Sequence, residues 1–150
     1  MTVATLAIST QPLLSIAADV LVLGVLKTAD GPRLQADDPA LQRLQSSLVA
    51  IGVTGAQDEV VRVPSDHDSV SSVALVGLGS SPISNDTLRY AAGSAARQLR
   101  GIESVVFGFP VVNDDAVLAV LEGAGIGAYA YTQYRVSSLA GTTLPATSIT

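Results

Sequence analysis

Two short segments of the chain are apolar at every position. Residues 20–26 and 73–78 contain only Val, Leu, Ala and Gly. A strand with one face in water alternates apolar and polar side chains, so an unbroken apolar run predicts a strand that is covered on both faces. Both runs are far shorter than the about 20 residues of a membrane helix. The chain is therefore expected to contain a buried, largely parallel sheet with helices on both sides.

Three further apolar runs predict strands at residues 3–8, 59–63 and 104–109. Three segments have the spacing of amphipathic helices. Two of them cover residues 38–52 and 84–101: the first is a helix of about 13 residues that starts at a capping Asp, and the second has a mostly alanine face that should lie close to the sheet. The third runs from residue 113 toward residue 129, with apolar positions at Val117, Leu118, Leu121 and Ala124.

The order of these elements is strand, strand, helix, strand, strand, helix, strand, helix. This alternation predicts a three-layer α/β/α domain with a mixed, mainly five-stranded sheet. At 150 residues and 15.3 kDa, the chain has the length of one domain. Residues 136–150 carry no charge and are rich in Ser and Thr. We therefore expect a domain over residues 1–135, followed by a linker or tail over residues 136–150, where a second domain would begin.

The acidic balance of the chain restricts its partners. It has 13 acidic and 8 basic residues and a net charge of -5, which opposes binding to nucleic acid or to an anionic membrane. Cysteine is absent, which excludes disulfides and thiolate chemistry. The first positively charged side chain is Lys27, so the amino terminus lacks the basic flank of a signal peptide. We expect a soluble, cytoplasmic protein.

Side chains that could carry out catalysis are few. His67 is the only histidine and lies between Asp66 and Asp68 in a loop, where adjacent residues cannot easily converge on one metal ion. No G-x-S-x-G, H-E-x-x-H or phosphate-loop sequence is present. The sequence therefore predicts no catalytic and no metal-binding residue in this chain.

One turn is a candidate phosphate site. Gly77, Gly79, Ser80 and Ser81 connect an apolar strand to a helix, and backbone amides at a helix entrance can hold an anion. The dinucleotide fingerprint requires a third glycine where this chain has Pro82. The two interpretations are a tight strand-to-helix turn and a cofactor-binding loop for a phosphate ligand.

Three arginines are expected on one side of the second helix. Arg89, Arg97 and Arg100 are separated by eight and eleven residues, steps that return close to the starting angle. This stripe is either an ordinary solvated face or a contact for an acidic partner, a neighbouring subunit or phosphates.

A glycine cluster near the end of the third helix has two interpretations as well. Gly123, Gly125 and Gly127 resemble a glycine loop, but they follow Glu122 inside a helical pattern rather than a strand, which argues against a nucleotide site. Close helix packing through small residues is the expected use.

The same segment carries a family resemblance. Residues 122–135 resemble the end of the amino-terminal domain of leucyl aminopeptidases, also called cytosol aminopeptidases, at Glu122, Gly123, Gly127, Tyr129, Tyr131 and Arg135. The strand at residues 19–25, the strand and turn at 73–79 and the helix at 88–93 are similar to the same domain, so the resemblance covers residues 3–135.

The resemblance implies a macro-domain-like fold at the front of a two-domain exopeptidase that removes amino-terminal residues from peptides. In that family two divalent metal ions, zinc or manganese, belong to the carboxy-terminal domain, which also forms the core of a homohexamer. The segments that supply those ligands are absent from this sequence. The implied role is a non-catalytic domain whose partners are its own catalytic domain and neighbouring subunits. The alternative is a stand-alone macro-like module that binds ADP-ribose or another phosphate ligand.

Overall fold

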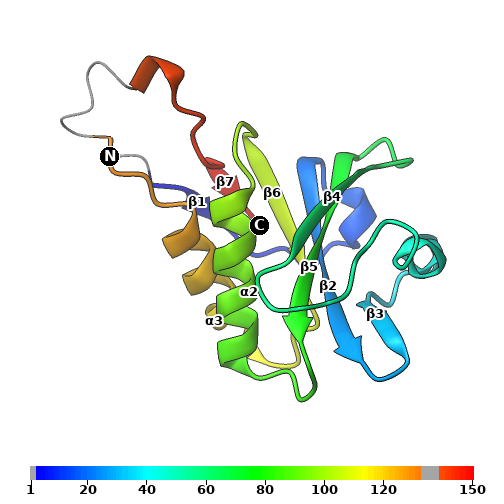
Figure 1. Cartoon of the computed structure of the whole chain (residues 1–150). Helices are drawn as coiled ribbons and strands as arrows, with labels where there is room; N and C mark the ends of the chain where they lie inside the picture. Colours follow the sequence, from blue (N-terminus) through cyan, green and yellow to red (C-terminus); the bar gives the residue numbers. More distant parts are fainter. Residues whose placement is uncertain (1–2, 133–138) are drawn as a thin grey trace.

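The computed structural model describes residues 3–132 and 139–150. The chain folds into a seven-stranded sheet with helices on both faces (Figure 1). In chain order the elements are β1 (Thr5–Leu6), η1 (Leu13–Ser15), β2 (Ala18–Thr28), β3 (Gly31–Gln35), α1 (Pro39–Gln42), η2 (Arg43–Ser47), β4 (Val60–Pro64), β5 (Val70–Gly79), α2 (Asn85–Gln98), β6 (Ser104–Gly108), α3 (Asp114–Gly127), η3 (Leu139–Gly141) and β7 (Ser148–Ile149). The predicted α/β/α class is confirmed.

The sheet is mixed, and its strand order is β1-β7-β6-β2-β5-β4, with β3 pairing to β2. The central pairs β2–β5 and β2–β6 are parallel, whereas β3 and β4 pair antiparallel to β2 and β5. Both predicted central strands are covered on each face: every residue from 20 to 23 is fully buried, as are Ala74, Leu75 and Val76. The sheet has seven strands rather than the five predicted, because β3 and β7 were missed.

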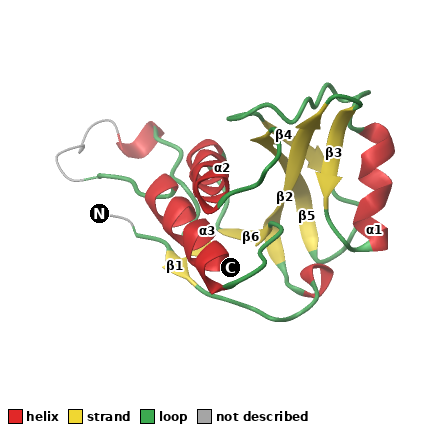
Figure 2. Ribbon diagram, turned by 90° about the horizontal axis from the view of Figure 1, so that it is seen from below, coloured by secondary structure: helices red, strands yellow, loops and turns green. Residues whose placement is uncertain are grey.

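Figure 2 shows α2 and α3 on one face of the sheet and α1 on the other. The α2–α3 side of the core is built largely from alanine and valine, and the α1 side contains more leucine. None of the helices in the described part of the chain is long and apolar enough to span a membrane.

The first predicted helix is wrong in its extent. Asp38 caps α1 by accepting a hydrogen bond from the Ala40 amide at 2.8 Å, as expected, but the α-helix ends at Gln42 and continues as the 3-10 helix η2. The side chain of Gln45 bonds to β3, accepting from the Leu34 amide at 2.7 Å and donating to the Pro32 carbonyl at 2.9 Å. This segment therefore follows the edge of β3 instead of forming a regular helix.

The other two helices begin where their caps predicted. The Ser84 hydroxyl accepts from the Thr87 amide at 3.1 Å, and the Asn113 side chain accepts from the Ala116 amide at 2.9 Å. The buried face of α3 differs from the predicted one, since Leu118 is 54% exposed. The buried positions are Ala116, Ala119, Val120, Gly123 and Ala124, because α3 packs on α2 through its smallest residues.

The α2–α3 seam, which we define by Gly93, Gly123 and Gly127, confirms the predicted helix packing for Gly123 and Gly127, whereas Gly125 faces the Leu6 side chain. A Cβ atom at Gly123 would overlap the Arg89 carbonyl oxygen, and one at Gly127 would overlap the Gly93 carbonyl oxygen. Glycine is therefore required at both positions for the two helix backbones to approach this closely.

Residues 148–150 bond to the sheet, so the expectation of a linker or tail over residues 136–150 is wrong for these last residues. β7 lies between β1 and β6, and Ile149 is buried. Thr150 donates its amide to the Val105 carbonyl at 3.0 Å and accepts from the Phe107 amide at 2.8 Å. Residues such as Ile149 and Thr150 are β-branched and favour strands. The proposed domain boundary at residue 135 lies outside the described residues and stays a prediction.

Candidate functional site

The turn after β5 uses its backbone amides within the fold. The Gly77 amide donates to the Glu59 carbonyl at 2.9 Å, and the Gly79 amide donates to the Gly55 carbonyl at 2.9 Å. A Cβ atom at Gly77 would overlap the Ala56 carbonyl oxygen, so glycine there lets the loop at residues 55–59 pack directly against β5. Both amides therefore donate to that loop and do not point toward a site for an anion.

The remaining residues of the candidate phosphate turn are exposed. Gly79 has a φ of 74°, which turns the chain out of β5, and Ser80 and Ser81 lie at the surface before α2 begins. The structure thus shows a tight strand-to-helix turn at this place. Phosphate binding by Ser80 and Ser81 stays a prediction.

The described residues do not supply a metal centre. His67 lies 3.5 Å from Asp66, whose carboxylate also pairs with Arg43 at 3.4 Å. No group of three or more His, Cys, Asp or Glu side chains that could hold a metal ion occurs among residues 3–132 and 139–150. The undescribed residues contain none of these four residue types. A two-metal site therefore does not fit this chain's own donor set.

The three arginines of the predicted stripe line one groove. Arg89, Arg97 and Arg100 lie with Tyr90 and Tyr129 around a hollow of about 440 Å³ above the α2–α3 seam. The prediction that they share one side is confirmed. Arg135, the last residue of the family pattern, lies outside the described residues.

Two of these arginines are paired with acidic side chains. Arg89 bonds to Glu122 at 2.9 Å and to Asp86 at 2.5 Å, and the hydrogen bond to Glu122 is the largest cause of a raised Arg89 pKa. Arg97 lies 3.0 Å from Asp58, a residue that also accepts from Ser94. The pairs with Glu122 and Asp58 join α3 and the loop at residues 55–59 to α2, so two of the three arginine charges in the groove are compensated by acidic side chains.

Arg100, the third arginine, donates to the backbone carbonyl oxygens of Arg97 at 3.1 Å and Thr143 at 3.4 Å. It therefore ties the end of α2 to the segment that leads into β7. An acidic partner for the stripe stays a prediction.

Asp19 holds the start of β6 and was not identified from the sequence. Its carboxylate accepts from the backbone amides of Glu103 at 2.8 Å and Ser104 at 2.9 Å. These two bonds, the one from Ser104 first, lower the pKa of Asp19 below its ordinary value. The only signal in the sequence was an acidic residue directly before a buried apolar run.

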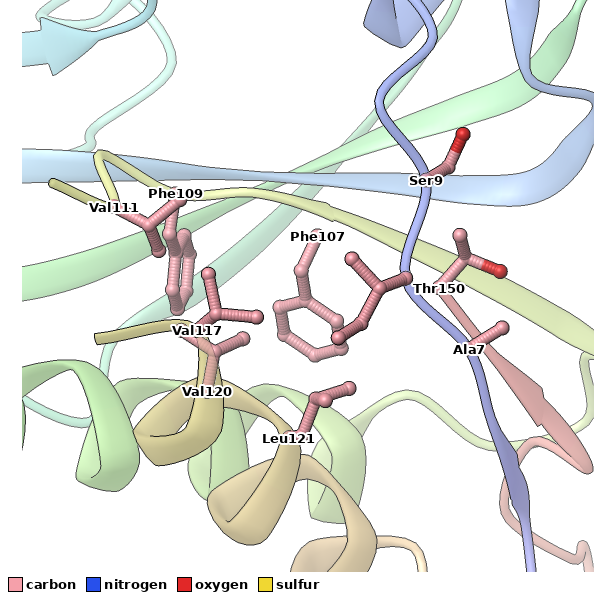
Figure 3. Close-up of a pocket in the computed structure, with 10 residues that line it drawn as sticks. Ala7, Ser9, Phe107, Phe109, Val111, Val117, Val120, Leu121 and Thr150 are labelled. Carbon is pink, nitrogen blue, oxygen red and sulfur yellow. The ribbon is translucent and has the colours of Figure 1, made fainter. Parts of the chain in front are cut away.

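A small apolar pocket lies between β6, α3 and the end of the chain (Figure 3). Its volume is about 110 Å³, and it is lined by Ala7, Ile8, Ser9, Phe107, Phe109, Val111, Val117, Val120, Leu121 and Thr150. The Phe107 and Phe109 rings lie edge to face, with centroids 5.4 Å apart. In Figure 3 the side chains of Val117 and Leu121 reach toward Phe107 from α3, and Ala7 and Thr150 lie on the other side.

Large apolar side chains are exposed in the segments that form this pocket. We call Ile8, Val111, Val112 and Leu118 the apolar rim; their exposed fractions are 69%, 44%, 87% and 54%. Ile8 and Val111 line the pocket itself, and Val112 and Leu118 adjoin lining residues in sequence. Sequence reasoning missed this surface because its members come from three distant segments. The run Pro110-Val111-Val112 before the helix cap was the available signal.

Solved structures resemble this fold. A mutant of tomato leucine aminopeptidase superposes with a TM-score of 0.72 over 99% of this chain and 32% of that chain, at 15% sequence identity. The bottromycin maturation enzyme BotP in complex with Mn superposes with a TM-score of 0.59 over 89% of this chain and 26% of that chain, at 25% identity. The fold is thus one found within aminopeptidases.

Sequence comparison identifies the family. The family model described as "Cytosol aminopeptidase family, N-terminal domain" matches residues 22–138. A probable cytosol aminopeptidase of Clavibacter michiganensis subsp. michiganensis is 41% identical over 100% of this chain and 30% of its own length. One of Leifsonia xyli subsp. xyli is 38% identical over 94% of this chain and 28% of its own length. The chain belongs to the cytosol aminopeptidase family and corresponds to its N-terminal domain; it spans less than a third of the length of these relatives.

Proposed function

We propose that this chain is the non-catalytic amino-terminal domain of a cytosol aminopeptidase, and that it serves the assembly, positioning or regulation of a separate catalytic part. The observation that carries the proposal is the match of residues 22–138 to the N-terminal domain of the family. The coverage agrees with it, since the whole chain aligns with only 30% of the Clavibacter relative.

The chemistry of the described residues supports a non-catalytic role. Hydrolysis of a peptide bond requires an activated nucleophile or a metal-bound water. His67 contacts Asp66 at the surface, Lys27 is exposed at the end of β2, and no acidic cluster able to hold a metal lies among the described residues. The nucleophile and its activating groups would therefore have to come from the catalytic part.

The remaining family properties belong to that catalytic part in our proposal. Its cofactors would be two divalent ions, zinc or manganese, and the Mn complex of BotP is consistent with divalent metal in such proteins. The partners of this domain would be its own catalytic domain and neighbouring subunits of a homohexamer. The names of the relatives, cytosol aminopeptidases, agree with a cytoplasmic location.

An activity assay tests the proposal. The 150-residue chain is incubated with leucine amide and added manganese or zinc, beside the Clavibacter relative as a positive control. We expect turnover by the relative and only the buffer rate for the chain. Turnover by the chain that follows its concentration would contradict a non-catalytic role.

A binding measurement tests the alternative function. Because the Gly77 and Gly79 amides already bond to the loop at residues 55–59, we expect no heat on titration of the chain with ADP-ribose. Saturable heat that is lost on changing Ser80 and Ser81 to alanine would favour the ligand-binding module instead.

A further inference from the structure

We propose that the apolar pocket and the apolar rim form the surface on which the catalytic part of the aminopeptidase docks, with one aliphatic side chain of that part inserted between Phe107 and Leu121. This inference rests on the proposed function, which supplies the partner. It adds the location of the contact and the chemistry of the partner surface.

The first argument is the exposure of the rim. Ile8 and Val111 line the pocket and are 69% and 44% exposed, and Val112 and Leu118, which follow lining residues in the chain, are 87% and 54% exposed. Single exposed apolar residues are normal on a protein surface, but a contiguous patch next to a hollow marks an interaction site. The ten lining residues include no charged side chain, so the surface suits an apolar protein partner rather than a phosphate or a nucleic acid.

The second argument is the size of the pocket. Its volume of about 110 Å³ is smaller than the about 150 Å³ of an apolar cavity that accepts benzene. There is room for one aliphatic side chain and not for a whole substrate or cofactor. The edge-to-face pair of Phe107 and Phe109 gives the pocket a fixed aromatic wall. This shape matches an anchor residue of a protein interface, which inserts one side chain into a preformed pocket.

The third argument is the position of the chain end. Thr150 lines the pocket, and both its amide and its carbonyl oxygen are bonded to β6, at 3.0 and 2.8 Å. In the Clavibacter relative the matched region is 30% of the length, and the matched family domain is the N-terminal one. In such a relative, the segment that follows the position of Thr150 starts beside the pocket. Covalent attachment there gives the following segment a high effective concentration at the rim.

The α2–α3 seam and the arginine groove are less suited than the pocket to an apolar partner. The three seam glycines line the same hollow as the arginines, and the two helix backbones are in close contact there. In the groove, Arg89 and Arg97 are paired with acidic side chains of this chain. The pocket differs from the groove because no charged side chain lines it, and because the exposed aliphatic residues Ile8 and Val111 form part of its lining.

Cysteine labelling tests the proposal. The chain has no cysteine, so Val112→Cys introduces a single thiol at the most exposed rim position. The matched control is Val49→Cys, whose side chain is 74% exposed and lies next to η2. Each variant is prepared as the 150-residue chain and as a fusion in which this chain replaces the matched region of the Clavibacter relative. The rate of maleimide modification at each site is measured by mass spectrometry of the peptide.

We expect modification at position 112 to be at least about tenfold slower in the fusion than in the chain alone, because a covered thiol reacts only after local opening. The rate at position 49 should be the same in both within about twofold. Leu118→Cys, at a second rim position, should follow position 112. Equal rates at position 112 in chain and fusion would overturn the proposal. Equal slowing at positions 112 and 49 would also overturn it, since the protection would not be specific to the rim. Slowing at position 112 in the chain alone on raising its concentration would assign the surface to a second copy and likewise overturn it.

Leucine amide turnover by the same fusion separates this inference from the proposed function. A fusion that turns over substrate but leaves position 112 unprotected overturns the docking surface and leaves the proposed function intact. Protection at position 112 in a fusion without turnover supports the docking surface and counts against the proposed function.

Discussion

Helix α3 contacts its surroundings in two regions that are built in opposite ways. On one side it meets α2 at the seam of Gly93, Gly123 and Gly127, where backbone atoms fill the space that side chains would occupy. On the other side Val117 and Leu121 border the pocket beside β6. The pocket has an open volume of about 110 Å³, and the four side chains of the apolar rim are exposed. The two helix backbones are in close contact at the seam, whereas side chains of α3 and β6 leave a hollow between them at the pocket.

The difference shows which surface of α3 belongs to the fold and which is available for a partner. Glycines at the seam let the backbones of α2 and α3 approach closely and fix the distance between the two helices. Large apolar residues at the pocket leave apolar surface exposed to water, which is unfavourable unless a partner buries it. This contrast predicts that substitutions which add volume destabilise the protein at the seam but are tolerated at the pocket.

The largest effect is expected at the seam. Gly123→Ala places a Cβ atom on the Arg89 carbonyl oxygen, so α2 and α3 must separate, and we expect the free energy of unfolding to fall by about 3 kcal/mol. The matched control is Gly125→Ala in the same helix, where the new Cβ would meet only the flexible Leu6 side chain at 3.3 Å. Urea unfolding monitored by circular dichroism measures both. A similar loss for the two variants would mean that the seam is not tightly packed.

The next effect concerns the start of β6, the strand that forms one wall of the pocket. Asp19→Asn removes a carboxylate that accepts from the Glu103 and Ser104 amides, and we expect a loss of about 2 kcal/mol at pH 7. Because folding lowers the Asp19 pKa, this contribution is fully present above the unfolded pKa of about 3.9 and is lost as the pH falls through the lowered value.

Urea unfolding at a series of pH values checks this dependence. The difference between the wild-type chain and Asp19→Asn should be constant from pH 7 to about pH 5 and shrink below about pH 4. A difference that stays constant through acid pH would show that the carboxylate does not carry the stabilisation.

A smaller effect of opposite sign is expected in the pocket. Val117→Phe adds volume to a side chain that borders the open space, and we expect the free energy of unfolding to rise by about 1 kcal/mol. The same change should weaken docking in the fusion, because the hollow would be filled. Calorimetric unfolding of the 150-residue chain measures the gain. A loss as large as that of Gly123→Ala would remove the contrast between pocket and seam.

The smallest effect is expected at the rim. Val112→Asp changes a side chain that is 87% exposed, so the free energy of unfolding of the 150-residue chain should change by no more than about 0.5 kcal/mol. A larger loss in urea unfolding would show that Val112 takes part in the fold of the chain itself.

The parts of the fold that the sequence predicted depend on local signals. The unbroken apolar runs of β2 and β5 and the caps Ser84 and Asn113 act within a few residues, and all four are where the patterns placed them. The candidate turn at Gly77 was also located correctly as a strand-to-helix connection. Its amide partners, Glu59 and Gly55, were not predictable from its own residues.

The missed parts depend on contacts between distant residues. β3 contains Pro32 and Arg33 and has no apolar alternation, and it becomes a strand because it pairs with β2 and receives the Gln45 side chain. β7 is only two residues long and is held by strands that lie more than 40 residues earlier in the chain. The pocket joins residues 7–9, residues 107–121 and Thr150, so no single stretch of sequence displays it.

We propose that this chain is the part of an aminopeptidase that does not itself carry out the reaction. The most direct test measures leucine amide hydrolysis by the 150-residue chain and by the fusion with the remainder of the Clavibacter relative, side by side with manganese. We expect the fusion to hydrolyse leucine amide and the 150-residue chain to show only the rate of the buffer blank. Turnover by the isolated chain in proportion to its concentration would contradict it.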